Sequence, residues 1–236
     1  MWIQIDKDYL NYIRDQGDSR VPFQNYGDHK FKPFFPVFTL KDSDITYVAN
    51  IGHYKQVDLN REDTLDYKKV IGRNGMCLGV IHLNTMIPVP NKYIINYDYS
   101  MIEEQLSWGE SFDFSRHLPR YPKYEQRIKE GDVYKSTILV YKIKNESLDP
   151  NSSKRTLDFK GLEAKGIEFR INKYLEENKS DFRHVLVEKN DDSFIVKSDD
   201  QDIKVSHAEL LNFDHFCNVT LMSLDLGDSL SDELEF

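Results

Sequence analysis

The stretch Ile45-Thr-Tyr-Val-Ala-Asn-Ile-Gly-His-Tyr-Lys55 decides how this chain can be interpreted. Its first seven residues form an apolar run, which predicts a buried β-strand over 45–51. Gly52 ends the run and lets the backbone turn sharply or approach a ligand closely. His53 can exchange a proton near neutral pH, and Lys55 carries a positive charge. A strand end is a rigid support, so this turn is the first candidate for a site that carries chemistry.

A partner strand is expected at 34–40, where the sequence FFPVFTL is apolar and aromatic. Lys41-Asp-Ser-Asp44 supplies a turn, which predicts a hairpin with 45–51. In an antiparallel hairpin, residues before 34 and after 51 lie at the same end, so the polar loop 23–33 should meet the turn at 52–55. The candidate residues of this loop are Tyr26, His29, Lys30 and Lys32.

A basic segment spans 116–144, where the net charge is +5 and tyrosines alternate with cations. Cations mixed with flat rings bind phosphates and stack unpaired bases, although such a segment can also be a plain solvated face. Its candidate RNA-binding residues are Arg116, Arg120, Lys123 and Arg127, with Tyr121 and Tyr124, and the segment also holds Lys135, Lys142, Tyr134 and Tyr141.

Composition sets the limits on fold and compartment. With 236 residues, including 14 Phe and 14 Tyr, the chain can form a large domain with a real core. No apolar run reaches membrane-spanning length and the N-terminus does not resemble a signal peptide, so we expect a cytosolic protein. Cys77 is expected to be a reduced core residue. No Cys or His pair has ligand spacing, so neither a metal site nor a cofactor is expected.

The net charge of −9 would argue against a nucleic-acid partner if it were evenly spread. It is not, because residues 173–236 hold 16 Asp and Glu against 6 Lys and Arg. We therefore expect a main domain at 1–172 and an acidic C-terminal extension at 173–236, made of a small β-meander, a helix and a tail.

Coarse patterning predicts the remaining elements. Helices are expected at 7–15, 98–107, 120–131, 157–178 and 206–213, and strands at 2–5, 76–83, 184–189, 193–198 and 202–205. Residues 56–72 are expected to be a loop with a short helix, 145–155 a loop, and 133–143 either a strand or a helix.

The candidate residues suit the cleavage of RNA. The ribose 2′-OH can attack the adjacent phosphorus if a base takes its proton, an acid protonates the leaving 5′ oxygen, and cations neutralise the phosphoryl oxygens. When side chains supply all three, no metal is needed, and the products carry a 2′,3′-cyclic phosphate and a 5′-OH. Taken singly, His53 could be an ordinary turn residue and Lys55 a solvated lysine; their convergence favours a phosphate-handling site.

Several motifs also point to a known family. They are Ile5-Asp-Lys-Asp-Tyr9-Leu-Asn-Tyr12-Ile with Val21-Pro22, then Lys32-Pro33-Phe34, Tyr47-Val-Ala-Asn-Ile-Gly-His-Tyr-Lys55, and Gly79-Val-Ile-His-Leu-Asn-Thr-Met-Ile-Pro-Val89. Together they resemble the ToxN/AbiQ family, the endoribonuclease toxins of type III toxin–antitoxin systems. The last motif is the most specific, and the helical segment 159–169 is similar to the closing helix of the family.

The resemblance implies an α+β fold with a compact, barrel-like, highly twisted antiparallel sheet and flanking helices, similar to the Kid/MazF toxins. It implies cleavage of single-stranded cellular or phage mRNA without metal. It also implies inhibition by a repetitive, pseudoknotted small RNA that the enzyme trims and with which it assembles into protein–RNA complexes. Residues 1–172 would be the endoribonuclease domain.

The resemblance further implies an active-site role for Lys55, which aligns with a lysine of the family. The family has hydroxyl residues where this chain has Gly52 and His53. Either His53 has taken over proton transfer or the activity is weaker. A family tyrosine corresponds to Tyr26 or His29, and a family lysine to Lys30 or Lys32.

Two other functions fit the sequence. The first is a non-catalytic RNA-binding module that has kept the fold. The second is a protein-interaction module in which the acidic tail at 225–236 mimics nucleic acid, at a basic partner or at the basic segment of the chain itself.

Overall fold

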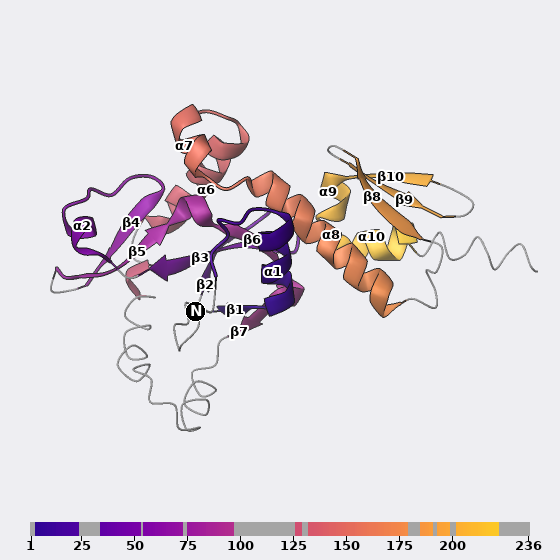
Figure 1. The fold of residues 1–236 in the computed structure, drawn as a ribbon, viewed down its shortest axis with the longest axis horizontal. Coiled ribbons are helices and arrows are strands. Elements are labelled where there is room, and N and C mark those ends of the chain that lie inside the picture. Colours follow the sequence, from indigo (N-terminus) through magenta and orange to yellow (C-terminus); the bar gives the residue numbers. More distant parts are fainter. Residues whose placement is uncertain are drawn as a thin grey trace, which may run out of the picture.

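A computed structural model describes residues 3–23, 34–52, 54–72, 75–96, 126–128, 132–178, 185–190, 193–198 and 202–221. The helices in these ranges are α1 (Lys7–Gln16), α2 (Gln56–Leu59), α6 (Val133–Asn145), α7 (Pro150–Arg155), α8 (Phe159–Glu177), α9 (His207–Leu210) and α10 (Phe213–Phe216). The strands are β1 (Ile3–Ile5), β2 (Phe34–Thr39), β3 (Ile45–Gly52), β4 (Tyr67–Ile71), β5 (Cys77–His82), β6 (Ile87–Pro90), β7 (Ile94–Asn96), β8 (Leu186–Asn190), β9 (Ser193–Lys197) and β10 (Asp202–Ser206). The long helix α8 lies between a larger lobe, which contains β1–β7, and a C-terminal lobe, which we define as the described part of 185–221 (Figure 1).

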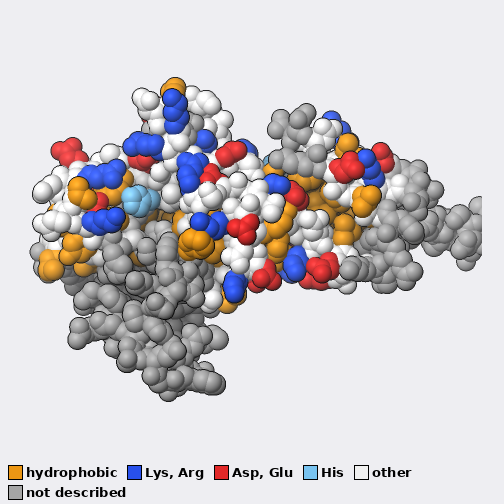
Figure 2. All heavy atoms as spheres, in the orientation of Figure 1, with side chains coloured by type: hydrophobic (Ala, Val, Ile, Leu, Met, Phe, Trp, Pro, Cys, Tyr) orange, Lys and Arg blue, Asp and Glu red, His pale blue; other side chains and the backbone are white. Residues whose placement is uncertain are grey.

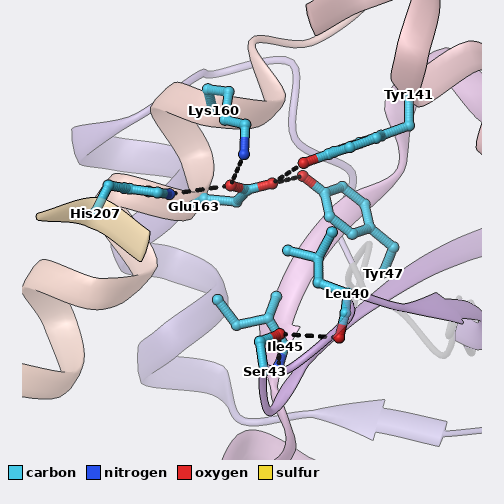
Figure 3. Close-up of polar contacts among 8 residues, drawn as sticks. All are labelled: Leu40, Ser43, Ile45, Tyr47, Tyr141, Lys160, Glu163 and His207. Carbon is cyan, nitrogen blue, oxygen red and sulfur yellow. Dashed lines mark hydrogen bonds and ion pairs between the residues drawn. The ribbon is translucent and has the colours of Figure 1, made fainter. Parts of the chain in front are cut away.

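The expected hairpin forms from β2 and β3. The two strands are antiparallel, and Phe34 at the start of β2 lies opposite Asn50 near the end of β3. In the turn, the Ser43 hydroxyl donates to the Leu40 carbonyl at 3.3 Å and accepts from the Ile45 N–H at 3.1 Å (Figure 3). Such a local side-chain contact favours a turn over a continued strand. The register confirms that the start of β2 and the end of β3 lie at the same end of the hairpin.

The hairpin is the centre of an antiparallel sheet. The strand order is β4-β5-β3-β2-β1-β7, and β6 pairs with β3. β3 is buried over most of its length because it packs between neighbours and against the main core, as its apolar sequence requires. The α+β class with an antiparallel sheet is confirmed.

The expected barrel does not close among the described residues, where β4 and β7 are the two ends of the sheet path. β4 pairs only with β5 there, and the short β7 pairs only with β1. The described sheet therefore has open edges, and the likeness to Kid/MazF toxins stays a prediction.

α1 and α8 pack on the main core around Tyr9. The Asp6 carboxylate caps α1 by accepting from the Tyr9 N–H at 3.0 Å. The Tyr9 ring stacks on Tyr93 with centroids 5.1 Å apart and meets Phe169 of α8 edge-on at 5.5 Å. A Cβ at Gly166 would lie 2.6 Å from the Tyr9 hydroxyl oxygen, so only glycine lets α8 approach this ring.

The C-terminal lobe contains the expected β-meander, in which β8, β9 and β10 pair antiparallel. Its own core includes Phe194, Ile167 and Ile171, of which the last two belong to α8. Arg170, which is 3% exposed, donates to both carboxylate oxygens of Asp44 at 2.8 and 2.6 Å. α8 thus contributes side chains to the cores of both lobes. The expected division of the chain after residue 172 stays a prediction.

Three sequence expectations need correction. Residues 145–155, expected as a loop, include α7, whose Pro150 suits the first helical position and whose Asn151 N–H donates to the Asp149 carboxylate at 3.0 Å. The loop expected at 56–72 ends in a strand, β4. Strands β6 and β7 were not expected at all.

Other expectations are settled directly. Residues 133–143 are helical, as part of α6. Cys77 is buried and free, as predicted. In the described ranges, no helix is both long and apolar enough to cross a membrane.

Candidate functional site

The turn after β3 presents Lys55 on a fixed backbone. The Lys55 N–H donates to the Asp58 carboxylate at 2.7 Å, and the Asp58 N–H donates to the Lys55 carbonyl at 2.9 Å. This pair of hydrogen bonds starts α2 directly after the turn. The Lys55 side chain itself is exposed. A cation is therefore displayed to solvent from a rigid support, which is what a phosphate-binding site needs.

Close packing beneath the turn fixes the end of β3. Ile51 and Gly52 lie opposite Ile81 and Val80 of β5. A Cβ at Gly79 would lie 2.8 Å from the Ile51 side chain and 2.9 Å from the Gly52 carbonyl, so Gly79 is needed for this approach. A Cβ at Gly52 would meet Val80 at 3.6 Å, an ordinary contact. Gly52 is thus not required by the packing, whereas Gly79 is.

Next to Lys55 lies a group of side chains that sequence reasoning missed. Asp58 is 8% exposed, and Tyr67 of β4 is 1% exposed, with the Arg61 guanidinium 4.0 Å from the centre of its ring. Burial, followed by the adjacent Asp58 carboxylate, raises the pKa of Tyr67 to about 12. Among the described residues the Tyr67 hydroxyl has no partner at hydrogen-bond geometry, although Asp58 is near enough to perturb it. Two lysines, Lys68 and Lys69, interrupt the apolar pattern of this strand, so no local signal in the sequence revealed it.

The surface over α2, β4 and β5 is rich in cations. Figure 2 shows Lys and Arg side chains gathered around a histidine on this part of the larger lobe. The backbone donor that begins α2 is the main cause that lowers the pKa of Asp58 below its usual value. An ionised carboxylate therefore lies among these cations at neutral pH.

Most predicted site residues lie outside the described residues. Among the residues predicted to be catalytic, the structure describes only Lys55. Among those predicted to bind RNA, it describes only Gly52 and Arg127. The predicted residues outside the described ranges are His53, Tyr26, His29, Lys30, Lys32, Arg116, Arg120, Lys123, Tyr121 and Tyr124. The placement of the loop residues Tyr26, His29, Lys30 and Lys32 near Lys55 stays a prediction, which the register of β2 and β3 supports.

The basic segment divides into surface and core residues where it is described. Lys135 and Lys142 are exposed on α6. Tyr141, in contrast, donates its hydroxyl to Glu163 at 2.9 Å and packs edge-on against Tyr47, with ring centroids 5.2 Å apart. Tyr141 is therefore part of the core and not a platform for bases.

Glu163 is the centre of a second polar cluster, drawn in Figure 3. Its carboxylate is 0% exposed and also accepts from Tyr47 at 2.7 Å, Lys160 at 2.9 Å and His207 Nε2 at 3.1 Å. Burial alone would raise the pKa of Glu163, but the hydrogen bonds from His207, Tyr47 and Lys160 outweigh it and hold the pKa below its usual value. Because this carboxylate is fully buried, the cluster stabilises the packing of these elements and is not a ligand site.

In the part of the chain that the structure describes, no group of three or more His, Cys, Asp and Glu side chains is arranged to hold a metal ion.

The fold and this cationic turn define the class of the protein: a mixed α+β protein with an antiparallel sheet and a basic site at the end of a central strand. Residues 1–166 match the family described as toxin ToxN, type III toxin–antitoxin system, and the chain belongs to this family. The resemblance predicted from the sequence motifs is confirmed. No curated protein sequence matches the chain.

Three solved structures are similar in fold. One comes from work on bacterial type III toxin–antitoxin systems in which a non-coding RNA pseudoknot selectively inhibits the toxin, with a TM-score of 0.55, 22% identity, and coverage of 72% of this chain and 96% of that one. A second, from work on a processed non-coding RNA that regulates a bacterial antiviral system, has a TM-score of 0.53, 20% identity, and coverage of 70% and 96%. The third is AbiQ, a lactococcal anti-phage endoribonuclease of the type III toxin–antitoxin system, with a TM-score of 0.51, 20% identity, and coverage of 72% and 97%.

Proposed function

We propose that this protein is an endoribonuclease toxin that cuts single-stranded cellular or phage mRNA without a metal ion. The observation that carries the proposal is the family match over 1–166 together with the rigid display of Lys55 at the end of β3. AbiQ, a structural neighbour, is an anti-phage endoribonuclease. The non-catalytic RNA-binding module is the alternative that the experiments must exclude.

The proposed reaction is an internal transesterification. The 2′ oxygen forms a bond to phosphorus, the bond from phosphorus to the 5′ oxygen breaks, and the products carry a 2′,3′-cyclic phosphate and a 5′-OH. Lys55 neutralises the charge that gathers on the phosphoryl oxygens, and His53 takes the 2′ proton. Tyr26 or His29, with Lys32 and Lys30, complete the site from the loop before β2. Gly52 allows close approach of the RNA backbone.

We propose that the partner is a repetitive antitoxin RNA with pseudoknotted repeats, which forms a protein–RNA assembly with the toxin. A structural neighbour is inhibited by a non-coding RNA pseudoknot, which supports this partner. Short tandem repeats followed by a terminator, just upstream of the reading frame, would supply such an RNA. The basic residues Arg116, Arg120, Lys123 and Arg127, with Tyr121 and Tyr124, are proposed to contact it.

Growth arrest tests the proposal in cells. Expression of the wild-type protein without the upstream RNA should stop growth, and Lys55→Ala and His53→Ala should each relieve the arrest. Lys41→Ala is the matched control, because Lys41 is 93% exposed at the opposite end of the β2–β3 hairpin. Full toxicity of both site variants would refute the assigned chemistry.

A further inference from the structure

His82, the last residue of β5, is an exposed imidazole supported by a buried ring. The register places His82 directly opposite Tyr67 of β4. The two rings meet edge to face, with centroids 5.3 Å apart and an interplanar angle of 65°. Since Tyr67 is 1% exposed, its buried ring supports the exposed His82 imidazole and limits its movement.

An ionised carboxylate lies in the same group. Asp58 is 8% exposed, and its carboxylate is fixed by the Lys55 N–H at 2.7 Å. That hydrogen bond is the largest cause that lowers the pKa of Asp58, and the nearby His82 lowers it further.

Other charged groups near this histidine lie between α2 and β4 and at the end of α7. Arg61 covers the Tyr67 ring at 4.0 Å and also lowers the pKa of Asp58. Arg155 of α7 pairs with Asp66, just before β4, at 3.6 Å. Each of these two cations thus has an acidic or aromatic neighbour of its own, and Asp58 is a carboxylate near the histidine.

His82 also lies on the face of the sheet that belongs to the candidate turn. Gly52 lies opposite Val80, and side chains alternate along a strand, so residues 80 and 82 of β5 share the face of Gly52. The same carboxylate that fixes the Lys55 backbone is coupled to His82. Lys55 and His82 are therefore both neighbours of the Asp58 carboxylate.

We infer that His82 is a further residue of the ribonuclease site and gives its proton to the departing 5′ oxygen. The inference rests on the proposed function. As the bond from phosphorus to the 5′ oxygen breaks, its electron pair goes to that oxygen, which takes the proton from the imidazolium and leaves neutral imidazole. The 2′ proton goes to the base of the proposed site, so one proton is taken and one is given.

The test uses two RNA substrates of the same sequence and the full-length protein. One has ordinary phosphodiesters, and the other has a sulfur in place of the 5′ oxygen at the cleaved bond. A sulfur leaving group departs without protonation, so a defect in proton donation disappears with it. His82→Ala should slow cleavage of the ordinary RNA by about 100-fold or more and restore a near wild-type rate on the sulfur substrate. His82→Gln should have the same effect as His82→Ala. The control is His215→Ala, which should leave both rates unchanged, because His215 is an exposed residue of α10 in the C-terminal lobe.

The outcomes separate the inference from the proposed function. If the wild-type protein cleaves neither substrate, the proposed function fails, and the inference falls with it. If the wild type cleaves but His82→Ala slows both substrates equally, or slows neither, the inference alone is overturned. The pH profile gives a second readout: an acid acts while protonated, so the wild-type rate should fall on the alkaline side and His82→Ala should lose that fall. Matching unfolding midpoints show that the variants remain folded.

Discussion

Glu163 of α8 accepts a hydrogen bond from Nε2 of His207 at 3.1 Å, and this contact joins the two lobes (Figure 3). The same carboxylate accepts from Tyr47 of the hairpin and Lys160 of α8. A fully buried charge is tolerated only when its partners satisfy it. The C-terminal lobe therefore supplies one of the groups that keep a core carboxylate of the larger lobe satisfied.

Replacing Glu163 should destabilise the protein strongly. Glu163→Ala leaves Lys160 and the hydroxyls of Tyr47 and Tyr141 without their acceptor, and we expect a loss of about 3 kcal/mol in the free energy of unfolding. Urea unfolding followed by circular dichroism measures it. Glu176→Gln is the control, because its pair with Lys173 is exposed and should contribute less than about 0.5 kcal/mol. Equal stability of Glu163→Ala and wild type would contradict the assigned role.

The same carboxylate predicts a pH dependence. The pKa of Glu163 is lower in the folded than in the unfolded state, so its contribution is complete above the unfolded value and is lost as pH falls through the folded value. Stability should therefore decrease on acidification below about pH 4.5. Glu163→Gln should show a shallower decrease over that window. Superimposable pH profiles for the variant and wild type would show that Glu163 does not contribute.

Asp44 should be important for stability although it lies in a turn. It receives both hydrogen bonds of the buried Arg170, whose guanidinium also lies 4.1 Å from the centre of the Phe213 ring. Asp44→Ala leaves that buried cation without its anion and should cost about 3 kcal/mol. Lys41→Ala, in the same turn but 93% exposed, should change the unfolding midpoint negligibly. Thermal unfolding compares the two, and equal midpoints would refute the prediction.

Two glycines near the candidate site should respond differently to alanine. Gly79→Ala places a methyl group against Ile51 and the Gly52 carbonyl, and should cost about 1–3 kcal/mol while displacing the end of β3. Gly52→Ala meets only an ordinary contact with Val80, so the fold should keep its stability within about 0.5 kcal/mol. Gly52→Ser, which restores a hydroxyl, should likewise fold normally. A larger loss of stability in Gly52→Ala than in Gly79→Ala would contradict the packing described.

The sequence predicted the elements whose pattern is local and strong. The apolar run of β3, the turn at 41–44 and the Asn/Asp-separated strands of the C-terminal lobe all formed as expected. In β4 two lysines interrupt the apolar pattern, and in β6 two prolines conceal a strand, yet the Pro88 carbonyl still accepts from Tyr9 at 2.7 Å. Strand pairing with distant segments decides such cases, and no local pattern reveals it.

The candidate site was predictable only in part. Lys55 could be chosen because a cation follows a strand end, and Asp58 could have been found from its spacing three residues later. The pairing of Tyr67 with His82 depends on the register of β4 and β5, which the sequence alone does not set. The same holds for Glu163, whose burial results from packing between residues far apart in the chain.

The ends of cleaved RNA test the central claim most directly. Purified wild-type protein, incubated with single-stranded RNA in excess EDTA, should produce fragments with 2′,3′-cyclic phosphate and 5′-OH ends, as measured by mass spectrometry. Lys55→Ala should slow the reaction by about 100-fold or more, because the charge on the phosphoryl oxygens is then no longer neutralised. Intact RNA with wild-type protein, or equal rates for wild type and Lys55→Ala, would contradict the account.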